Sequence, residues 1–224
     1  MQYRQGATLA AYRRGQDYFT RYAELLGRFA DSPARRRLDR VVKRLETAFA
    51  QQVRSAKAAE GLTERKHDLR QALRDGQMRL ITAIGRADLA PELKHMREFR
   101  VPRIRTDDAE LLSAARALRH AAAAQPAAFV KIGGLRRTFL NDFDAAIDAL
   151  QDTIVAREGQ LLEHRRHCLA AVGLILQGRE VLRMLTSFVN MKFHGTRPDL
   201  VGEWKMAIRI SEKPGPSRRR RGGG

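Results

Sequence analysis

Three groupings of histidine with carboxylate or thiol side chains have the spacing of metal ligands. Glu64 with His67, and Glu92 with His95, follow the Glu-x-x-His spacing that places two ligands on one helical face in di-iron bundles. Such a centre also needs two further carboxylates that point into a dry core. Here the first pair stands among cations and the second follows Pro91. We therefore interpret both pairs as solvated surface motifs.

The third grouping is His164, His167 and Cys168, with Glu163 beside them. Two histidines three residues apart can share a metal ion, and a thiolate adds a soft ligand. However, two arginines separate the histidines, and Cys168 continues an apolar stripe, as expected of a residue type that is usually buried. We interpret Cys168 as structural and the histidines as polar residues of a turn. We expect neither a metal nor another cofactor.

No motif for catalysis is recognisable in the sequence. No glycine-rich loop follows a strand, so a phosphate cradle of the Walker or Rossmann kind is not expected, and Gly133 and Gly134 are better interpreted as a helix end. No Ser/His/Asp or Cys/His set is found. Most acidic residues are interleaved with arginine at helical spacing, as on a solvated helix face. We expect a protein that is not an enzyme.

The distribution of charge is the strongest functional signal. The net charge is +18, of which residues 1–106 carry +12, residues 107–210 carry +2 and residues 211–224 carry +4. Lysine and arginine side chains that neutralise phosphates release counterions, so this asymmetry favours a polyanionic partner. The alternative is that an Arg- and Ala-rich chain only reflects genome composition.

Two groups of basic residues are the candidate contacts for a polyanion. The first shares one face of a predicted helix, opposite its apolar stripe: Arg36, Arg40, Lys43 and Arg44. The second is a continuous run near the C-terminus: Arg218, Arg219, Arg220 and Arg221. Because no helix-turn-helix signature or aromatic stacking platform accompanies them, readout of base sequence is not expected. The alternative is a solvated helix face and a solubilising tail.

The elements that position these residues are helical. Good helix formers dominate, and strand-favouring runs are scarce, so we predict an all-α fold: an antiparallel helical bundle of about five to six main helices with a disordered basic C-terminal tail. The single cysteine gives no sign of an oxidising compartment. No signal peptide is recognised, and the longest apolar run is far shorter than the roughly 20 residues that span a bilayer. We expect a cytoplasmic protein that does not bind membranes.

Capping residues and periodicity suggest where the helices begin and end. A first helix is expected over residues 8–30. A second starts at Pro33, after a cap at Asp31 or Ser32, and its apolar stripe runs to Val53. We expect Gly61 to end it and Thr63 to cap the next helix, so that the two form an antiparallel hairpin.

The second half of the chain begins with a linker at residues 89–105. Thr106 and the acidic residues after it predict a helix that runs to residue 124. For residues 135–193 we favour two helices with a turn in the polar patch 157–167, and the alternative is one long, bent helix. A short segment around Trp204 is expected to dock on the bundle.

These elements predict a single helical-bundle domain over residues 1–213, followed by a disordered Arg/Gly tail at 214–224. An alternative subdivision separates a basic hairpin region, 1–88, from a C-terminal bundle, 106–210, at the linker 89–105.

Several features occur in a fixed order along the chain. They are the early helical hairpin, residues 99–103 (FRVPR), a helix that ends before Pro126, residues 178–185 (GREVLRML), the Trp204-Lys205 segment and residues 213–216 (KPGP). Their order resembles that of an uncharacterised family of all-helical bacterial proteins, over roughly residues 30–216. The resemblance implies a helical fold. Since the family has no established activity, it lends no functional residue.

Two hypotheses of different kinds follow. The first is a non-enzymatic helical protein that binds DNA or RNA without sequence specificity, through its basic N-terminal half and arginine tail. The alternative is an assembly or scaffold protein that acts through helix–helix contacts with a partner protein or with itself. Exposed leucine or phenylalanine side chains on one helix face would favour the alternative.

Overall fold

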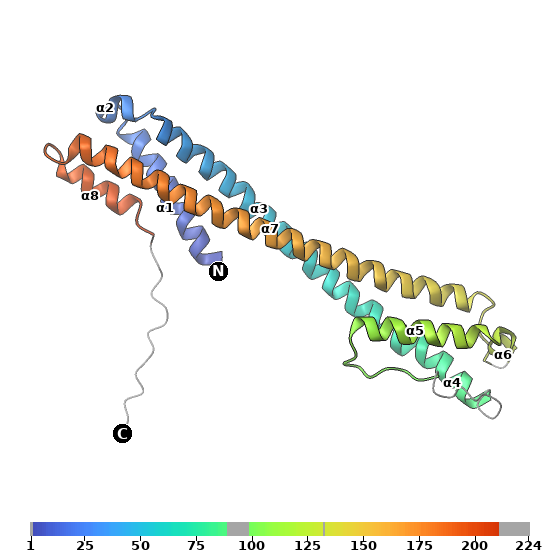
Figure 1. Ribbon diagram of the computed structural model, residues 1–224. Helices are drawn as coiled ribbons and strands as arrows, with labels where there is room; N and C mark the ends of the chain where they lie inside the picture. The colour runs from blue at the N-terminus through green and yellow to red at the C-terminus, as the bar shows by residue number, and fades with distance from the viewer. Residues whose placement is uncertain (1, 89–98, 132, 211–224) are drawn as a thin grey trace, which may run out of the picture. The chain divides into compact units, whose positions relative to one another are not determined.

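The computed structural model describes residues 2–88, 99–131 and 133–210 (Figure 1). These residues form helices and connecting segments, with no strand among them, so the predicted all-α fold class is confirmed. In chain order the elements are α1 (Gln2–Arg21), α2 (Ala23–Leu26), the 3₁₀ turn η1 (Gly27–Phe29), α3 (Pro33–Gln71), the π-helical segment η2 (Ala72–Met78), α4 (Arg79–Asp88), α5 (Asp108–Ala123), α6 (Pro126–Lys131), α7 (Phe139–Phe193) and α8 (Pro198–Ala207).

Two helices are longer than predicted. α3 has 39 residues and passes through Gly61 and Thr63, so the hairpin predicted at this point is wrong. α7 has 55 residues, so the turn predicted at 157–167 is also wrong and the alternative of one long helix is observed. A glycine inside a helix costs only about 1 kcal/mol, which packing of the rest of the helix can offset.

The chain divides into two compact units, and both long helices contribute to each. Unit 1 comprises residues 1–54 and 164–224, and unit 2 comprises residues 55–163. The divisions therefore fall inside α3 and α7, whereas the sequence predicted a single domain over residues 1–213, with a division at the linker 89–105 as the alternative. Residues 89–98 of that linker lie outside the described residues.

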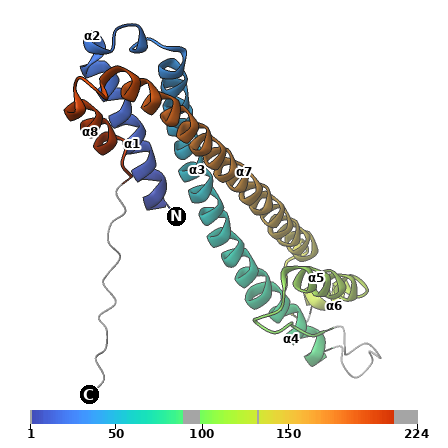
Figure 2. The ribbon, with the colours of Figure 1, turned by 60° about the vertical axis from the view of Figure 1, so that its left-hand side comes forward.

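Unit 1 is built around an aromatic core. Within it, α1 and α8 lie beside the C-terminal part of α7, and the first part of α3 runs antiparallel to that part (Figures 1 and 2). Tyr12, Phe19 and Trp204 are at most 1% exposed. The indole Nε1 of Trp204 donates to Thr186 Oγ1 at 2.9 Å, so its one polar group is satisfied. The predicted docking of the Trp204 segment is confirmed.

Unit 2 encloses its own apolar core between α4, α5, α6 and parts of α3 and α7. Leu73, Leu111 and Phe129 are at most 1% exposed there. Asp107 caps α5, because its Oδ1 accepts a hydrogen bond from Glu110 N at 2.7 Å. The helix predicted from Thr106 therefore exists, and it begins two residues later.

Two further expectations concern membrane-spanning helices and the C-terminal tail. Among the described helices, none combines the length and apolarity needed to cross a bilayer. The tail at 214–224, which was predicted to be disordered, lies outside the described residues.

Candidate polyanion-binding surface

The first turns of α3 separate an apolar face from a basic one. Ser32 Oγ accepts a hydrogen bond from Arg35 N at 3.2 Å and Pro33 begins the helix, as the sequence predicted. Successive residues turn by about 100° around a helix axis. The side chains that this spacing places in the core of unit 1 are Leu38, Val41, Val42 and Leu45. The basic residues between them fall on the opposite face.

This opposite face is called the α3 basic face, and it consists of Arg36, Arg40, Lys43 and Arg44. All four side chains are exposed, and none has an ion pair or hydrogen bond with another described residue. They span nine residues of sequence, which is about 12 Å along the helix axis. The four cations are therefore close together and available to a ligand.

The guanidinium of Arg35, next in sequence to this face, is held by three partners. It forms an ion pair with Asp39 and donates to the carbonyl oxygen of Gln16 and to Thr20 Oγ1, both at 3.2 Å. Burial lowers the pKa of Arg35. Gln16 Nε2 also donates to Asp39 at 2.5 Å. The one acidic residue within the range of the basic face is thus occupied by contacts between α3 and α1.

Several predicted residues cannot be placed together with this face. Arg218 to Arg221 lie outside the described residues, as do Glu92 and His95. Glu64 and His67 are exposed on α3, in unit 2, as expected of a solvated motif. Among the described residues, no three metal-binding side chains are grouped.

The structure does bring His164 and Cys168 together, on α7 and not in a turn. Their Nε2 and Sγ atoms are 3.6 Å apart, and Gln52 Nε2 donates to Cys168 Sγ at 3.0 Å. His164 Nδ1 lies 3.2 Å from the carbonyl oxygen of Gln52. These contacts join α3 to α7 inside unit 1, and Cys168 is half-buried.

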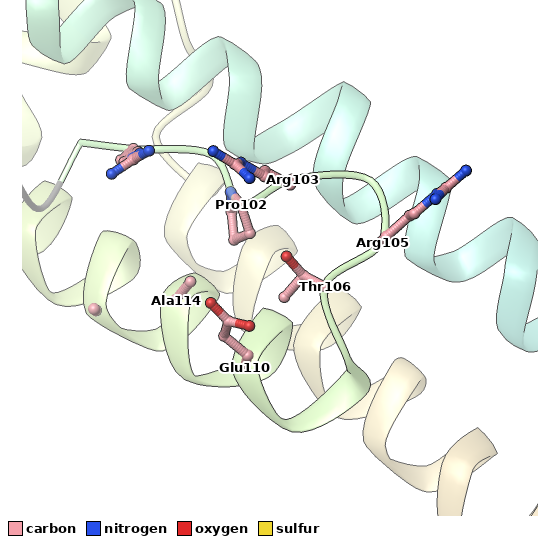
Figure 3. A pocket seen from close by; sticks show the side chains of 8 residues that line it. Pro102, Arg103, Arg105, Thr106, Glu110 and Ala114 are labelled. Atoms are coloured by element: carbon pink, nitrogen blue, oxygen red, sulfur yellow. The ribbon is translucent and has the colours of Figure 1, made fainter.

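A second group of arginines lines a pocket in unit 2 that was not predicted from the sequence. The pocket has a volume of about 740 Å³ and lies between α5 and the connector, residues 99–107 (Figure 3). It is lined by Arg100, Pro102, Arg103, Arg105, Thr106, Glu110, Ala114 and Ala117. Only two features of the sequence pointed to this region: the FRVPR block at residues 99–103 and the basic charge of residues 1–106.

α7 also presents an exposed apolar stripe in unit 1. Leu169, Val172 and Leu176 are 72%, 45% and 54% exposed, and their spacing of three and four residues places them on one helical face. Ala171 and Leu174 are the buried residues at this level of α7.

Comparison of this chain with models of protein families, with curated proteins and with solved structures finds no match. The resemblance to a family of helical bacterial proteins therefore stays a prediction. Function has to be inferred from the residues and their geometry.

Proposed function

We propose that this chain binds DNA or RNA without sequence specificity, through the α3 basic face and the arginines at 218–221. The observation that carries the proposal is the exposure of four cations on one helical face, with no partner among the described residues. Each can pair with a phosphate without breaking an existing contact. Guanidinium groups also match phosphate oxygens in bidentate geometry.

The spacing of the four cations along α3 suits contacts with the phosphates of a nucleic acid better than contacts with its bases. A duplex carries one negative charge per roughly 1.7 Å of its axis, so about 12 Å of helix meets several phosphates in any register. Contacts to phosphates set position and affinity but do not read sequence. We therefore expect similar affinity for unrelated duplexes of the same length.

Salt dependence gives the quantitative test. The four contacts of the α3 basic face alone predict a slope of about −3.6 in the logarithm of affinity against the logarithm of salt, which is about 150-fold between roughly 50 and 200 mM. Contacts made by the arginines at 218–221 would add to this slope. Fluorescence anisotropy with a labelled duplex measures this slope. Affinity that does not respond to salt, or no binding at low salt, would contradict the proposal.

A matched pair of variants assigns the slope to the α3 basic face. The first variant changes all four of its residues to glutamine. The control makes the same change in charge on α7, where four exposed arginines spread over 19 residues of sequence: Arg165, Arg166, Arg179 and Arg183. We expect the α3 variant to lose about 3.6 of the slope and the control to keep the wild-type slope. Equal losses would show that total charge acts, and not the clustered face.

The contribution of the arginine run is measured separately. Changing Arg218, Arg219, Arg220 and Arg221 to glutamine in the full chain should reduce the slope further in the α3 variant. If this change alone abolishes binding, the tail is the binding element and the α3 basic face is not.

The apolar stripe on α7 favours a second candidate function, self-association. A stripe at spacing three and four is typical of helices that pair through a heptad seam. A two-fold axis near Val172 would set Leu169 of one copy against Leu176 of the other. Light scattering should then show a concentration-dependent dimer. Changing Leu169 and Leu176 to glutamine should give a monomer, whereas the same change at exposed Val53 should not. A wild-type monomer at every concentration would exclude this candidate.

A further inference from the structure

Three arginines tie the connector of unit 2 to the neighbouring helices. Each donates a hydrogen bond to a backbone carbonyl, so the path of the connector is fixed at its beginning, middle and end. The pairs are Arg86 Nε with Phe99 O at 3.0 Å, Arg74 Nε with Pro102 O at 3.1 Å, and Arg70 Nη2 with Thr106 O at 2.5 Å.

Both ends of the connector are anchored by side chains as well. Phe99 is 2% exposed and stacks on Phe129, with 6.3 Å between ring centroids. At the other end, Asp108 accepts a hydrogen bond from Lys66 Nζ at 2.8 Å and forms an ion pair with Arg70. Because these groups hold the backbone, the connector can present its remaining side chains in defined positions.

Those remaining side chains include three arginines with no protein partner. Arg100, Arg103 and Arg105 alternate with the anchored positions and are exposed, and none of their side chains has an ion pair or hydrogen bond within the described part of the chain. All three line the pocket. The arginines of unit 2 therefore form two sets. One set holds the backbone of the connector, and the other lies along the rim of the pocket, where Figure 3 shows the side chain of Arg105 extending away from α5.

The opposite side of the pocket has a different chemistry. Figure 3 shows Glu110 and Ala114 on α5 facing Pro102 and Thr106 on the connector. The alanines and the proline offer a small apolar wall, and the carboxylate of Glu110 can accept a hydrogen bond from a ligand. The residues that line the pocket thus include three arginines, a single glutamate and four uncharged residues.

We infer that this pocket binds a nucleoside polyphosphate. The pocket volume lies within the roughly 300–1,000 Å³ range of small-ligand sites. Arginine side chains along the rim of the pocket suit a chain of phosphates, because a guanidinium group can form two parallel hydrogen bonds with phosphate oxygens. The apolar wall suits the face of a base, and Glu110 suits a hydroxyl or amino donor of the nucleoside.

This inference is independent of the proposed nucleic-acid binding, since the pocket shares no residue with the α3 basic face. The test uses the full chain and isothermal titration at low salt, with ATP and inorganic triphosphate as probes. We expect saturable binding of ATP. Changing Arg100, Arg103 and Arg105 to glutamine should weaken it at least about tenfold, the effect of losing one or more hydrogen bonds between charged groups.

A control variant makes the same change in charge at three exposed arginines of unit 2 that do not line the pocket: Arg65, Arg136 and Arg137. ATP affinity should stay within about twofold of wild type in this control, and also in the variant that lacks the α3 basic face. A tenfold loss in either would overturn the inference, because general positive charge would then explain the binding. Absence of saturable ATP binding would overturn it as well.

Two further variants sharpen the assignment. R103K keeps the charge but loses the bidentate geometry, so its affinity for ATP should fall between those of the wild type and the triple variant. E110Q should strengthen binding of inorganic triphosphate, because it removes a repulsive charge, and should help ATP less. If triphosphate binds the wild type as tightly as ATP does, the nucleoside part of the inference is wrong.

Discussion

Units 1 and 2 both present exposed arginines, but they position them by different means. In unit 1 the α3 basic face follows from helical periodicity, because residues buried on one side leave the cations on the other. In unit 2 the connector has no helical periodicity. Its exposed arginines take their places because three other arginines hold the backbone that carries them.

The difference shows that pairing, more than the number of charges, defines a candidate site. Arg35 and Arg36 are neighbours in sequence, yet the first is engaged by α1 and the second is free among the described residues. In unit 2, Arg74 donates a hydrogen bond to the carbonyl oxygen of Pro102, whereas the side chain of Arg103 has no partner among the described residues. Each unit should therefore be disturbed by different substitutions.

The largest effect is expected where α1 crosses α7 in unit 1. A Cβ atom on Gly178 would lie 2.2 Å from a ring carbon of Tyr12, which is fully buried. Tyr12 cannot move easily, because its hydroxyl also donates to the carbonyl oxygen of Ile175 at 2.6 Å. We expect G178A to lower the free energy of unfolding by about 3 kcal/mol, as measured by urea denaturation.

Gly173 provides the control on the same helix, because a Cβ atom there meets nothing within 4 Å. G173A should raise stability by up to about 1 kcal/mol through helix propensity alone. If G178A were as stable as G173A, the close approach of α1 to α7 would be wrong.

A similar substitution in unit 2 should act on the connector. A Cβ atom on Gly85 would lie 2.5 Å from the ring of Phe99, the buried anchor of the connector. We expect G85A to cost about 2 kcal/mol, less than G178A, because a connector can shift more readily than a helix. It should also weaken ATP binding in the titration described above, while duplex binding stays unchanged. G61A, which meets nothing within 4 Å, is its control.

The sequence predicted those parts of the fold that depend on local patterns. Caps and periodicity correctly placed the start of α3 at Pro33, and they located α5 and α8. They failed at Gly61 and at residues 157–167, where one helix passes from the core of one unit to that of the other. A polar stretch of continuous helix looks like a turn, because the long-range contacts that retain it, such as Arg157 Nε with Thr63 Oγ1 at 2.9 Å, leave no local pattern.

The same limit applies to the candidate sites: one that depends on a local pattern could be predicted, and one that depends on long-range contacts could not. The α3 basic face could be found because both its residues and its opposing stripe lie within one short segment. The pocket could not, because the bonds that separate anchoring from exposed arginines join residues 13 to 36 apart in sequence. Composition alone does not say which arginines are already engaged.

The anchor at the end of the connector should make unit 2 sensitive to acid. Burial alone would raise the pKa of Asp108, but hydrogen bonds and charges from Lys66 and Arg70 outweigh it and hold the pKa below its ordinary value of 3.8. The unfolded chain therefore binds this proton more tightly than the folded protein does. The stabilisation is present above about pH 4 and is lost as the pH falls through the folded-state pKa.

D108N tests this assignment, with an expected cost of about 1.5 kcal/mol at neutral pH. Urea denaturation at a series of pH values should show a smaller loss of stability in acid for D108N than for the wild type. D68N, at an exposed aspartate of the same unit, should follow the wild-type profile. A steep acid loss retained in D108N would mean that another carboxylate is responsible.

The smallest effect comes from comparing the two adjacent arginines at the start of α3. R35Q removes the ion pair with Asp39 and the bonds to α1, so we expect it to destabilise unit 1 by about 1 kcal/mol, allowing for the solvent exposure of Asp39. R36Q breaks no contact within the described residues and should change stability by less than about 0.5 kcal/mol. In duplex binding the order should reverse, because only R36Q removes a phosphate contact and reduces the salt slope by about one. If R35Q reduced the slope as much as R36Q while stability stayed unchanged, the division between engaged and available arginines on α3 would be wrong.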